Sequence, residues 1–380
     1  MRLLVCVPWY APARGFGGGI LTSLLATVEG VLEAGHDVTV ATTDLLDSHS
    51  RVPRDAPAEP AGVQVLRFPN LSQRLAASHA PLPRGLRPWL REHAREFDVV
   101  LIQDVYSSLS VLGARAAVRA RVPYVLQAYG TLPTSHERGR AAVKRAFLAL
   151  WARRTVREAA ACLYLSESER REYLAQGAES ARLHAVPPSL DISSPDNIPR
   201  SSKPSVVYLG RLDPIKRIDV LLDAFARVRA ELPDATFDVI GAPTAYGEEL
   251  RTRAGEGVSF RGLIPEEEKG RALASSHVFA LLSASEGLPV APLEALACGT
   301  PVVLSPGCGL PQVDGVAGIV CDGSAAGAAE ALLALLRDPA RAEALGAAGR
   351  TFASAYRREN VVPGLVALLE RVATSSSSAA

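Results

Sequence analysis

The sequence predicts an α/β protein of two domains, each built around a parallel sheet of the Rossmann-like kind. Short apolar runs typical of buried strands alternate with helical stretches along most of the chain. A Ser- and Pro-rich segment at 187–204 interrupts this alternation near the middle. With 380 residues, the chain is long enough for both halves to bury a core of their own.

The composition is that of a globular protein, with 48% hydrophobic and 21% charged residues. The sequence contains no run of about 18 uncharged apolar residues and no cleavable signal pattern, so we expect a cytoplasmic protein. The five cysteines are odd in number and show no Cys-x-x-Cys spacing, which argues against a disulfide framework and a zinc site. We expect no nucleic-acid partner.

The first half of the chain opens with a βαβ unit. Residues 2–8 form an apolar run that predicts a buried strand, and 20–34 place apolar residues on one face of a helix that leads into a second strand. Three consecutive glycines, 17–19, precede this helix, where absent side chains allow a phosphate or sugar to approach the backbone. A flexible loop without a ligand is the alternative interpretation.

Two further strands of the first half end at polar residues. Residues 98–102 lead into Gln103 and Asp104, and 124–127 lead toward Tyr129. Ligands of open α/β sheets bind at the carboxyl ends of the strands, so we expect these side chains on the acceptor side of a binding cleft. Tyr129 can donate a hydrogen bond but is a poor base at neutral pH, whereas Asp104 is the nearest carboxylate for that role.

Positive charge is concentrated in the first half. Residues 1–190 carry 23 Lys and Arg against 17 Asp and Glu, and 191–380 carry 18 against 23. Residues 138–157 hold seven basic and no acidic side chains and present one apolar face. Such a helix suggests a membrane surface and a lipid-diphosphate acceptor. The alternative is an ordinary helix that packs on the sheet and keeps its arginines in water.

In the second half, two cations flank a predicted strand-to-helix turn. Arg211 and Lys216 stand five residues apart, directly after the apolar run at 205–209. Such a pair can clamp a diphosphate, because Arg offers a fork of donors and Lys a point charge. Two solvent-exposed charges without a ligand are the alternative.

A second strand-loop-helix unit carries two carboxylates. Residues 278–283 predict a buried strand, 294–298 a short helix, and Gly299 the end of that helix. Glu286 in the loop and Glu294 on the helix can accept hydrogen bonds from sugar and ribose hydroxyls without titrating. The loop's backbone N–H groups and the helix start favour a nearby anion. Taken alone, two Glu residues at this spacing are more often a solvent-exposed loop Glu and a helix-surface Glu, which is the alternative interpretation.

The residues from Glu286 to Val302 resemble the signature of glycosyltransferase family 4, Glu-Gly-x-Pro followed by Glu-Ala-x-Ala-x-Gly-x-Pro-Val. The Gly-Arg-Leu-x-x-x-Lys segment at 210–216 matches the same family. The resemblance implies a GT-B fold, in which two Rossmann-like domains face a central cleft. It also implies retaining transfer from a nucleotide-diphospho-sugar, with no metal and no other cofactor.

The resemblance also assigns roles to individual residues. Arg211 and Lys216 neutralise the leaving diphosphate, and Glu286 contacts the donor-sugar hydroxyls. The residues expected to bind the donor are Gly17, Gly18, Gly287, Leu288 and Glu294. The residues expected on the acceptor side are Gln103, Asp104 and Tyr129.

The acceptor side departs from the family pattern. Relatives often carry His near Gln103, and a His-Gly or Arg-Gly pair where this chain has Tyr129-Gly130. Retaining transfer of this type is usually described with a donor phosphate oxygen assisting the acceptor hydroxyl, so the chemistry does not require that His. The departure bears on the acceptor geometry and on activity.

The resemblance and the linker composition together define expected domain boundaries. They are 1–186 for an acceptor-binding domain, 187–204 for a linker, 205–358 for a nucleotide-sugar-binding domain, 359–373 for a helix that crosses back to the first domain, and 374–380 for a disordered tail.

The sequence thus predicts a retaining, metal-independent hexosyltransferase in bacterial polysaccharide or glycolipid biosynthesis. We expect a UDP- or GDP-sugar donor, a glycan or lipid-linked acceptor, and peripheral contact with the inner face of a membrane as one interpretation of the basic helix. One alternative is a nucleotide-sugar-binding GT-B protein without transfer activity. Another is a nucleotide-sugar epimerase, which the shortage of histidines near the expected cleft disfavours.

Overall fold

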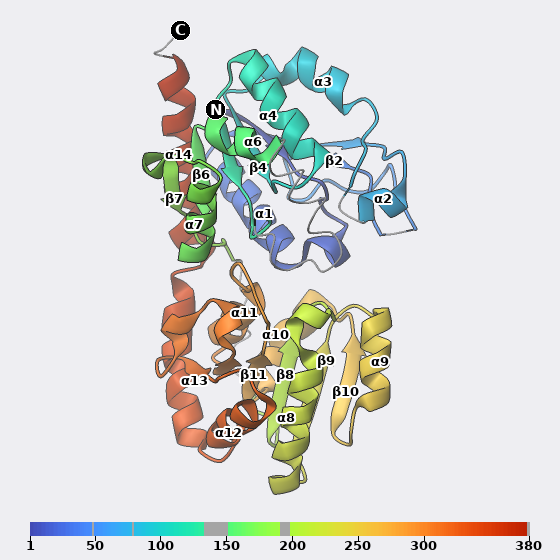
Figure 1. Cartoon of the computed structure of the whole chain (residues 1–380), viewed down its shortest axis with the longest axis vertical. Coiled ribbons are helices and arrows are strands. Elements are labelled where there is room, and N and C mark those ends of the chain that lie inside the picture. Colours follow the sequence, from blue (N-terminus) through green and yellow to red (C-terminus); the bar gives the residue numbers. More distant parts are fainter. Residues whose placement is uncertain (48, 78–79, 133–150, 191–197, 378–380) are drawn as a thin grey trace. The chain divides into compact units, whose positions relative to one another are not determined.

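The structure is a computed structural model, drawn in Figure 1. It describes residues 1–47, 49–77, 80–132, 151–190 and 198–377. Contacts divide the chain into two compact units. Unit 1 comprises Met1–Ser189 together with Arg358–Ala380, and unit 2 comprises Leu190–Arg357. Each unit has its own parallel sheet and its own core.

The described residues of unit 1 form a seven-stranded parallel sheet in the order β3-β2-β1-β4-β5-β6-β7. The strands are β1 (Arg2–Cys6), β2 (Asp37–Thr43), β3 (Gln64–Phe68), β4 (Val99–Gln103), β5 (Tyr124–Gln127), β6 (Ala161–Tyr164) and β7 (Leu183–Ala185). The strand order reverses between β1 and β4, which is where open α/β sheets form their ligand crevice.

Helices cover both faces of this sheet. They are α1 (Arg14–Glu33), α2 (Gln73–Ala77), α3 (Leu86–His93), α4 (Ser108–Ala120), α6 (Arg153–Glu158), α7 (Glu167–Ala175) and α14 (Arg358–Ser377). Along β1, Leu3 and Val5 pack into the apolar cluster shared with α1 and α14, whereas Leu4 and Cys6 pack on the opposite face. This alternation follows from the two-residue period of a strand.

Two helices of unit 1 differ from expectation at their ends. Helix α1 begins at Arg14, six residues before the predicted start, so Gly17 and Gly18 lie inside its first two turns and not in a preceding loop. Helix α14 continues to Ser377, so the predicted disordered tail was wrong for residues 374–377. The Thr374 hydroxyl bonds back to the Glu370 carbonyl oxygen at 3.0 Å, which satisfies it within the helix.

The predicted basic helix at 138–157 lies mostly outside the described residues, which resume within it at 151. Helix α6 covers only the end of that stretch. Within the parts of the chain that the structure describes, no helix has the length and apolar character needed to cross a membrane. All five cysteines are buried and have free thiols.

Unit 2 contains a six-stranded parallel sheet in the order β10-β9-β8-β11-β12-β13. The strands are β8 (Ser205–Leu209), β9 (Thr236–Ile240), β10 (Val258–Gly262), β11 (Val278–Leu281), β12 (Val302–Leu304) and β13 (Gly318–Val320). The order reverses between β8 and β11, so the carboxyl ends of these two central strands form the switch point of the unit.

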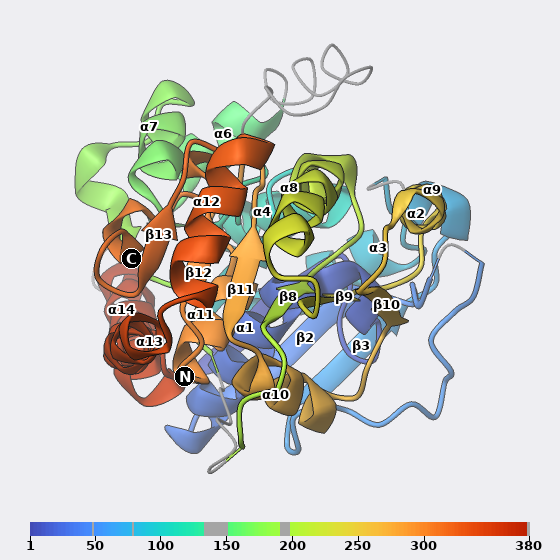
Figure 2. The same cartoon turned by 90° about the horizontal axis from the view of Figure 1, so that it is seen from below.

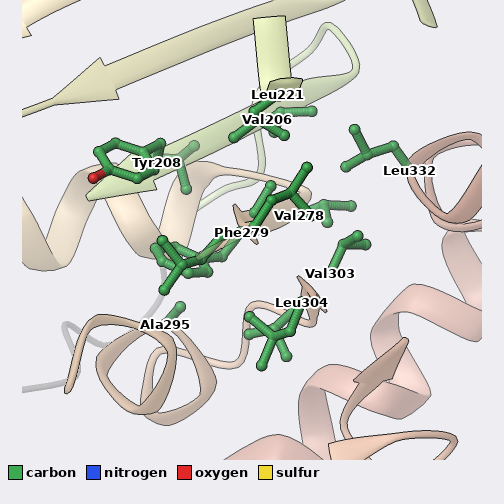
Figure 3. Packing of buried hydrophobic residues seen from close by; sticks show 14 of the residues in the cluster. Val206, Tyr208, Leu221, Val278, Phe279, Ala295, Val303, Leu304 and Leu332 are labelled. Atoms are coloured by element: carbon green, nitrogen blue, oxygen red, sulfur yellow. The ribbon is translucent and has the colours of Figure 1, made fainter. Parts of the chain in front are cut away.

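The helices of unit 2 are α8 (Ile218–Glu231), α9 (Ala245–Arg253), α10 (Glu266–Ser275), α11 (Val290–Ala297), α12 (Ala325–Leu336) and α13 (Pro339–Ser354). Helices α8 and α12 lie side by side on one face of the sheet in Figure 2. Figure 3 shows part of the core of unit 2, in which Val206 of β8, Phe279 of β11 and Leu332 of α12 belong to one apolar cluster.

Helix α11 begins at Val290, four residues earlier than predicted. Pro289 stands immediately before it in an extended conformation, and proline restricts a helix less at its start than within it. The predicted end is confirmed, because Gly299 follows the helix with φ +76°, a left-handed conformation that glycine adopts without strain.

Candidate functional site

The switch point of unit 2 brings together two loops that lie far apart in the sequence. One follows β8 and contains the short 3-10 helix Pro214–Lys216, and the other follows β11. The Ala284 N–H donates to the Ile215 carbonyl oxygen at 2.8 Å, which joins the two loops directly. Every predicted site residue of unit 2 except Glu294 lies in one of them.

Glu286 is held at the centre of this switch point. Its Oε1 atom forms an ion pair with Lys216 and accepts a hydrogen bond from the Ser283 hydroxyl at 2.6 Å. The side chains of Lys216 and Glu286 are only 14% and 15% exposed. Among the described residues, Glu286 Oε2 has no hydrogen-bond partner, so one carboxylate oxygen remains available to accept from a hydroxyl of a ligand.

Arg211 differs from Lys216 in having no side-chain partner within the described part of the chain. It is exposed, and its backbone is fixed because the Tyr208 hydroxyl donates to the Arg211 carbonyl oxygen at 2.7 Å. Of these two cations, Lys216 is therefore neutralised by Glu286, whereas Arg211 is free to bind an anion. Together with Glu286, the three side chains carry a net charge of +1, which favours an anionic ligand.

A glycine loop supports the β11 side of the site. A Cβ atom at Gly307 would lie 2.3 Å from the Ser283 carbonyl oxygen, so only glycine allows the loop to approach this closely. The Ser305 hydroxyl donates to the same oxygen at 2.7 Å. Ser283 is thus fixed through its backbone while its own hydroxyl holds Glu286.

Glu294 occupies a second, separate ion pair. It projects from α11 and accepts a hydrogen bond from Lys269 of α10 at 2.8 Å, and its side chain is 11% exposed. Gly287 and Leu288 lie between Glu286 and the start of α11. Sequence reasoning identified the two Glu residues but missed Ser283 and Lys269, which hold them, because an isolated Ser or Lys carries no motif.

In unit 1, Gln103 and Tyr129 belong to one buried hydrogen-bond network. Gln103 ends β4 and donates from Nε2 to Gln127 Oε1 of the adjacent β5 at 3.2 Å. The Tyr129 hydroxyl lies beside the side chains of Ser23 and Gln103, and the Ser189 N–H donates to Ser23 Oγ at 2.9 Å. Burial raises the pKa of Tyr129 to about 12, so its side chain is a neutral phenol at physiological pH.

Asp104 lies beside this network but is engaged in its own loop. Its backbone is left-handed, with φ +89°, and its Oδ1 atom accepts from the Tyr106 N–H at 2.8 Å. This is a local turn in which an Asp side chain replaces a backbone acceptor. The carboxylate thus has a structural function whatever its part in chemistry.

The predicted site residues divide between the two units. Those in unit 2 are Arg211, Lys216, Glu286, Gly287, Leu288 and Glu294. Those in unit 1 are Gly17, Gly18, Gln103, Asp104 and Tyr129. Among the described residues, no group of three or more His, Cys, Asp or Glu side chains is arranged to hold a metal ion.

Two family models match the chain, one in each half. The model described as "Glycosyl transferase 4-like domain" matches residues 18–189, and the model described as "Glycosyl transferases group 1" matches residues 203–338. The matched segments contain all the predicted site residues except Gly17.

Curated relatives match over most or about half of the chain. The GDP-mannose-dependent alpha-(1-6)-phosphatidylinositol monomannoside mannosyltransferase of Mycolicibacterium smegmatis is 31% identical over 372 residues, which cover 90% of this chain and 91% of the relative. The D-inositol 3-phosphate glycosyltransferase of Geodermatophilus obscurus is 32% identical over 229 residues, 53% of this chain and 50% of the relative.

Solved structures establish the fold. Anabaena HepE, crystallised with UDP and glucose, superposes with a TM-score of 0.77 at 20% identity, covering 98% of this chain and 100% of that one. The lipopolysaccharide glycosyltransferase WaaG gives a TM-score of 0.71 at 18% identity, covering 97% and 99%. The two parallel-sheet units match these GT-B glycosyltransferase structures, as the sequence predicted.

Proposed function

The chain belongs to glycosyltransferase family 4, and we propose that it transfers a hexosyl unit, with retention and without a metal ion, from a GDP- or UDP-sugar to a glycan or lipid-linked acceptor. The observation that carries this proposal is the arrangement at the switch point of unit 2. There Glu286 neutralises Lys216 but not Arg211, and Glu286 Oε2 has no partner among the described residues, so it can accept from a sugar hydroxyl.

The proposed chemistry uses Arg211 and Lys216 for the leaving group. As the bond between the sugar C1 and the diphosphate oxygen breaks, negative charge grows on the diphosphate, and the two cations stabilise it more in the transition state than in the ground state. The acceptor oxygen forms its bond to C1 on the same face, and its proton passes to the departing phosphate oxygen. Glu286 Oε2 accepts from a sugar hydroxyl and holds the ring in place.

For the donor, we propose GDP-mannose as the first candidate. The relative that matches 90% of this chain is named as GDP-mannose-dependent, and its 31% identity extends over both units. UDP-sugars remain the second class. The ribose of either nucleotide would meet Glu294, whose position on α11 is fixed by Lys269.

For the acceptor, we propose a lipid-linked saccharide reached by peripheral contact of unit 1 with the inner face of a membrane. Support comes from residues around α2, where Leu71, Leu75 and Leu82 are 53%, 47% and 44% exposed. Residues 60–91 contain five Arg and no Asp or Glu. Exposed leucines flanked by arginines suit the surface of an anionic bilayer.

A thermal-shift panel tests the donor proposal. GDP, UDP, ADP and their sugars are added with and without EDTA to the wild type, to Arg211→Ala and to Arg227→Ala. Arg227 is an exposed Arg of α8 without a side-chain partner among the described residues, so it controls for loss of charge. We expect nucleotides of one base, guanine or uracil, to raise the melting temperature of the wild type and of Arg227→Ala with EDTA present. Arg211→Ala should lose that increase.

The same panel separates the alternatives. If no nucleotide at millimolar concentration shifts the wild type, the transferase proposal is wrong. A GDP or UDP shift without transfer, and without slow donor hydrolysis, would instead indicate a sugar-nucleotide-binding protein. That second candidate is favoured by Gln103 and Tyr129-Gly130, which depart from the family pattern of His near the first position and His-Gly or Arg-Gly at the second.

A further inference from the structure

We propose that Glu169 is a positioning residue for the acceptor side: it holds the turn at Tyr129-Gly130 and thereby places the Tyr129 hydroxyl. The inference rests on the proposed transferase function, because it assigns that turn to the acceptor. It concerns a residue of α7 that neither the signature nor the donor chemistry uses.

Glu169 is a buried carboxylate, with 2% of the residue exposed. Its Oε1 accepts from the Gly130 N–H and its Oε2 from the Leu165 N–H, both at 2.7 Å. Within the described part of the chain, no cation pairs with it. Among the described residues, two backbone N–H groups and the N-terminal turn of α7 compensate its charge.

Burying a carboxylate without a cation partner costs free energy. The two backbone N–H groups that Glu169 binds therefore indicate which contacts offset this cost. Leu165 directly precedes the Ser166 cap of α7, a local contact of a kind that many helix starts make. Gly130 is different, because it lies 39 residues away in the chain. The long-range bond therefore ties α7 to the loop after β5.

That loop needs support because it is strained. Tyr129 and Gly130 both adopt left-handed backbone conformations, with φ +49° and +73°. Such a conformation is unfavourable for Tyr and persists only where the surroundings impose it. Tyr173, one helical turn after Glu169 on α7, holds the other end of the loop, because its hydroxyl accepts from the Ala128 N–H at 2.8 Å.

The restrained turn fixes where the Tyr129 side chain points. Its hydroxyl meets Ser23 of α1 and Gln103 of β4. Gln103 Oε1 is buried and has no partner among the described residues. If the Gly130 tether were lost, Tyr129 could relax to a right-handed conformation, and its hydroxyl would leave both neighbours. Glu169 thus acts on the acceptor side through Tyr129 without touching a substrate itself.

Hydrogen exchange tests the tether without relying on activity. Glu169→Gln keeps the size of the side chain but turns one acceptor oxygen into an NH2 group that faces a backbone donor. Exchange should become faster in peptides that contain Gly130 and Leu165 and stay unchanged in unit 2. Glu167→Gln is the matched control, because Glu167 lies on the same helix and is 62% exposed. Unchanged exchange at Gly130 in Glu169→Gln would overturn the proposal.

Kinetics test the consequence, with GDP-mannose and vesicles that contain phosphatidylinositol mannoside. Glu169→Gln should raise the acceptor KM by about tenfold, since a small misplacement near the chemistry has large effects, and leave the donor KM and slow donor hydrolysis unchanged. Tyr129→Phe should raise the acceptor KM in the same way but should leave hydrogen exchange at Gly130 and Leu165 unchanged. Equal changes in donor and acceptor KM would contradict a positioning role.

Tyr173→Phe provides a second variant if Glu169→Gln does not fold. It removes the bond to the Ala128 N–H and keeps the packing of the ring, so it should raise the acceptor KM in the same direction. An unchanged acceptor KM in a folded Tyr173→Phe would count against the proposal. A wild type that shows no transfer would overturn the proposed pairing of GDP-mannose with a lipid-linked acceptor instead, and the exchange result would still decide whether Glu169 holds the turn.

Discussion

Lys216 forms an ion pair with Glu286, although 70 residues separate them in the chain. The pair joins the loops after the two central strands of unit 2 at the point where the strand order reverses. Because both side chains are largely buried, each compensates the charge of the other before any ligand arrives. The cation and the carboxylate are thus held in place in advance, which limits the reorganisation needed when a donor binds.

This relationship predicts strong coupling between the two residues. Lys216→Met should leave the Glu286 charge uncompensated and lower the free energy of unfolding by about 1 to 2 kcal/mol, less than for a fully buried pair because both side chains keep some solvent contact. Glu286→Gln in the Lys216→Met background should recover most of that loss. Chemical denaturation of the single and double variants measures the coupling, and purely additive effects would contradict the pair.

Arg211 should behave in the opposite way. Because its side chain has no partner among the described residues, Arg211→Ala should change the free energy of unfolding by no more than about 0.5 kcal/mol. The same variant should weaken nucleotide-diphosphate binding by about tenfold or more, since a charge-assisted contact is lost. Calorimetric titration with GDP checks the affinity. A clear loss of stability in the free variant would mean that Arg211 has a structural partner.

The glycine loop predicts a specific backbone effect. Gly307→Ala would bring a Cβ within 2.3 Å of the Ser283 carbonyl oxygen, so the loop or the strand end must shift, at a cost of about 1 to 3 kcal/mol. Because Ser283 holds Glu286, donor affinity should fall as well. Gly255→Ala is the control, since nothing lies within 4 Å of its added Cβ. A Gly307→Ala variant with unchanged melting temperature and donor affinity would refute this explanation.

The leucines around α2 predict a measurable membrane contact. The double variant Leu71→Ser/Leu75→Ser should bind vesicles containing phosphatidylglycerol about tenfold more weakly, because two half-exposed apolar side chains no longer enter the bilayer. Val118→Ser is the control, since Val118 is 40% exposed on α4. Vesicle sedimentation at low and high salt measures the apolar and the electrostatic contributions to vesicle binding. Equal binding of all three proteins would exclude this surface.

The sequence predicted where the loops that carry Arg211, Lys216 and Glu286 lie, because strand ends are marked locally by apolar runs that stop at Gly or Pro. It did not predict what holds them. Lys269 meets Glu294 across 25 residues, and no local pattern encodes that contact. The sequence also placed the start of α1 too late, because three glycines disfavour a helix on propensity alone and tertiary structure overrides such a preference.

Glu169 shows where a local signal was present but incomplete. Ser166 and Glu169 have the Ser-x-x-Glu spacing of a capping box, and Ser166 Oγ accepts from the Glu169 N–H at 3.3 Å. That spacing predicts the start of α7. It contains no information about the Gly130 N–H, which lies 39 residues away in the chain and after β5, the strand that pairs with β6.

Stability should depend on pH through His277, which lies at the amino ends of the central strands of unit 2, away from the donor loops. Its Nδ1 accepts from Ser205 Oγ at 2.9 Å, and burial lowers the pKa of this ring below its usual 6.5. As the pH falls, the unfolded chain therefore takes up the proton first. The contribution of the neutral His277 ring to the free energy of unfolding is complete above pH 6.5 and is lost as the pH falls below it. His277→Asn keeps an acceptor and cannot titrate. Melting curves from about pH 7.5 to about pH 5.5 should lose part of their pH dependence in this variant, while GDP affinity stays unchanged. An identical pH dependence in both proteins would show that His277 does not titrate in this range.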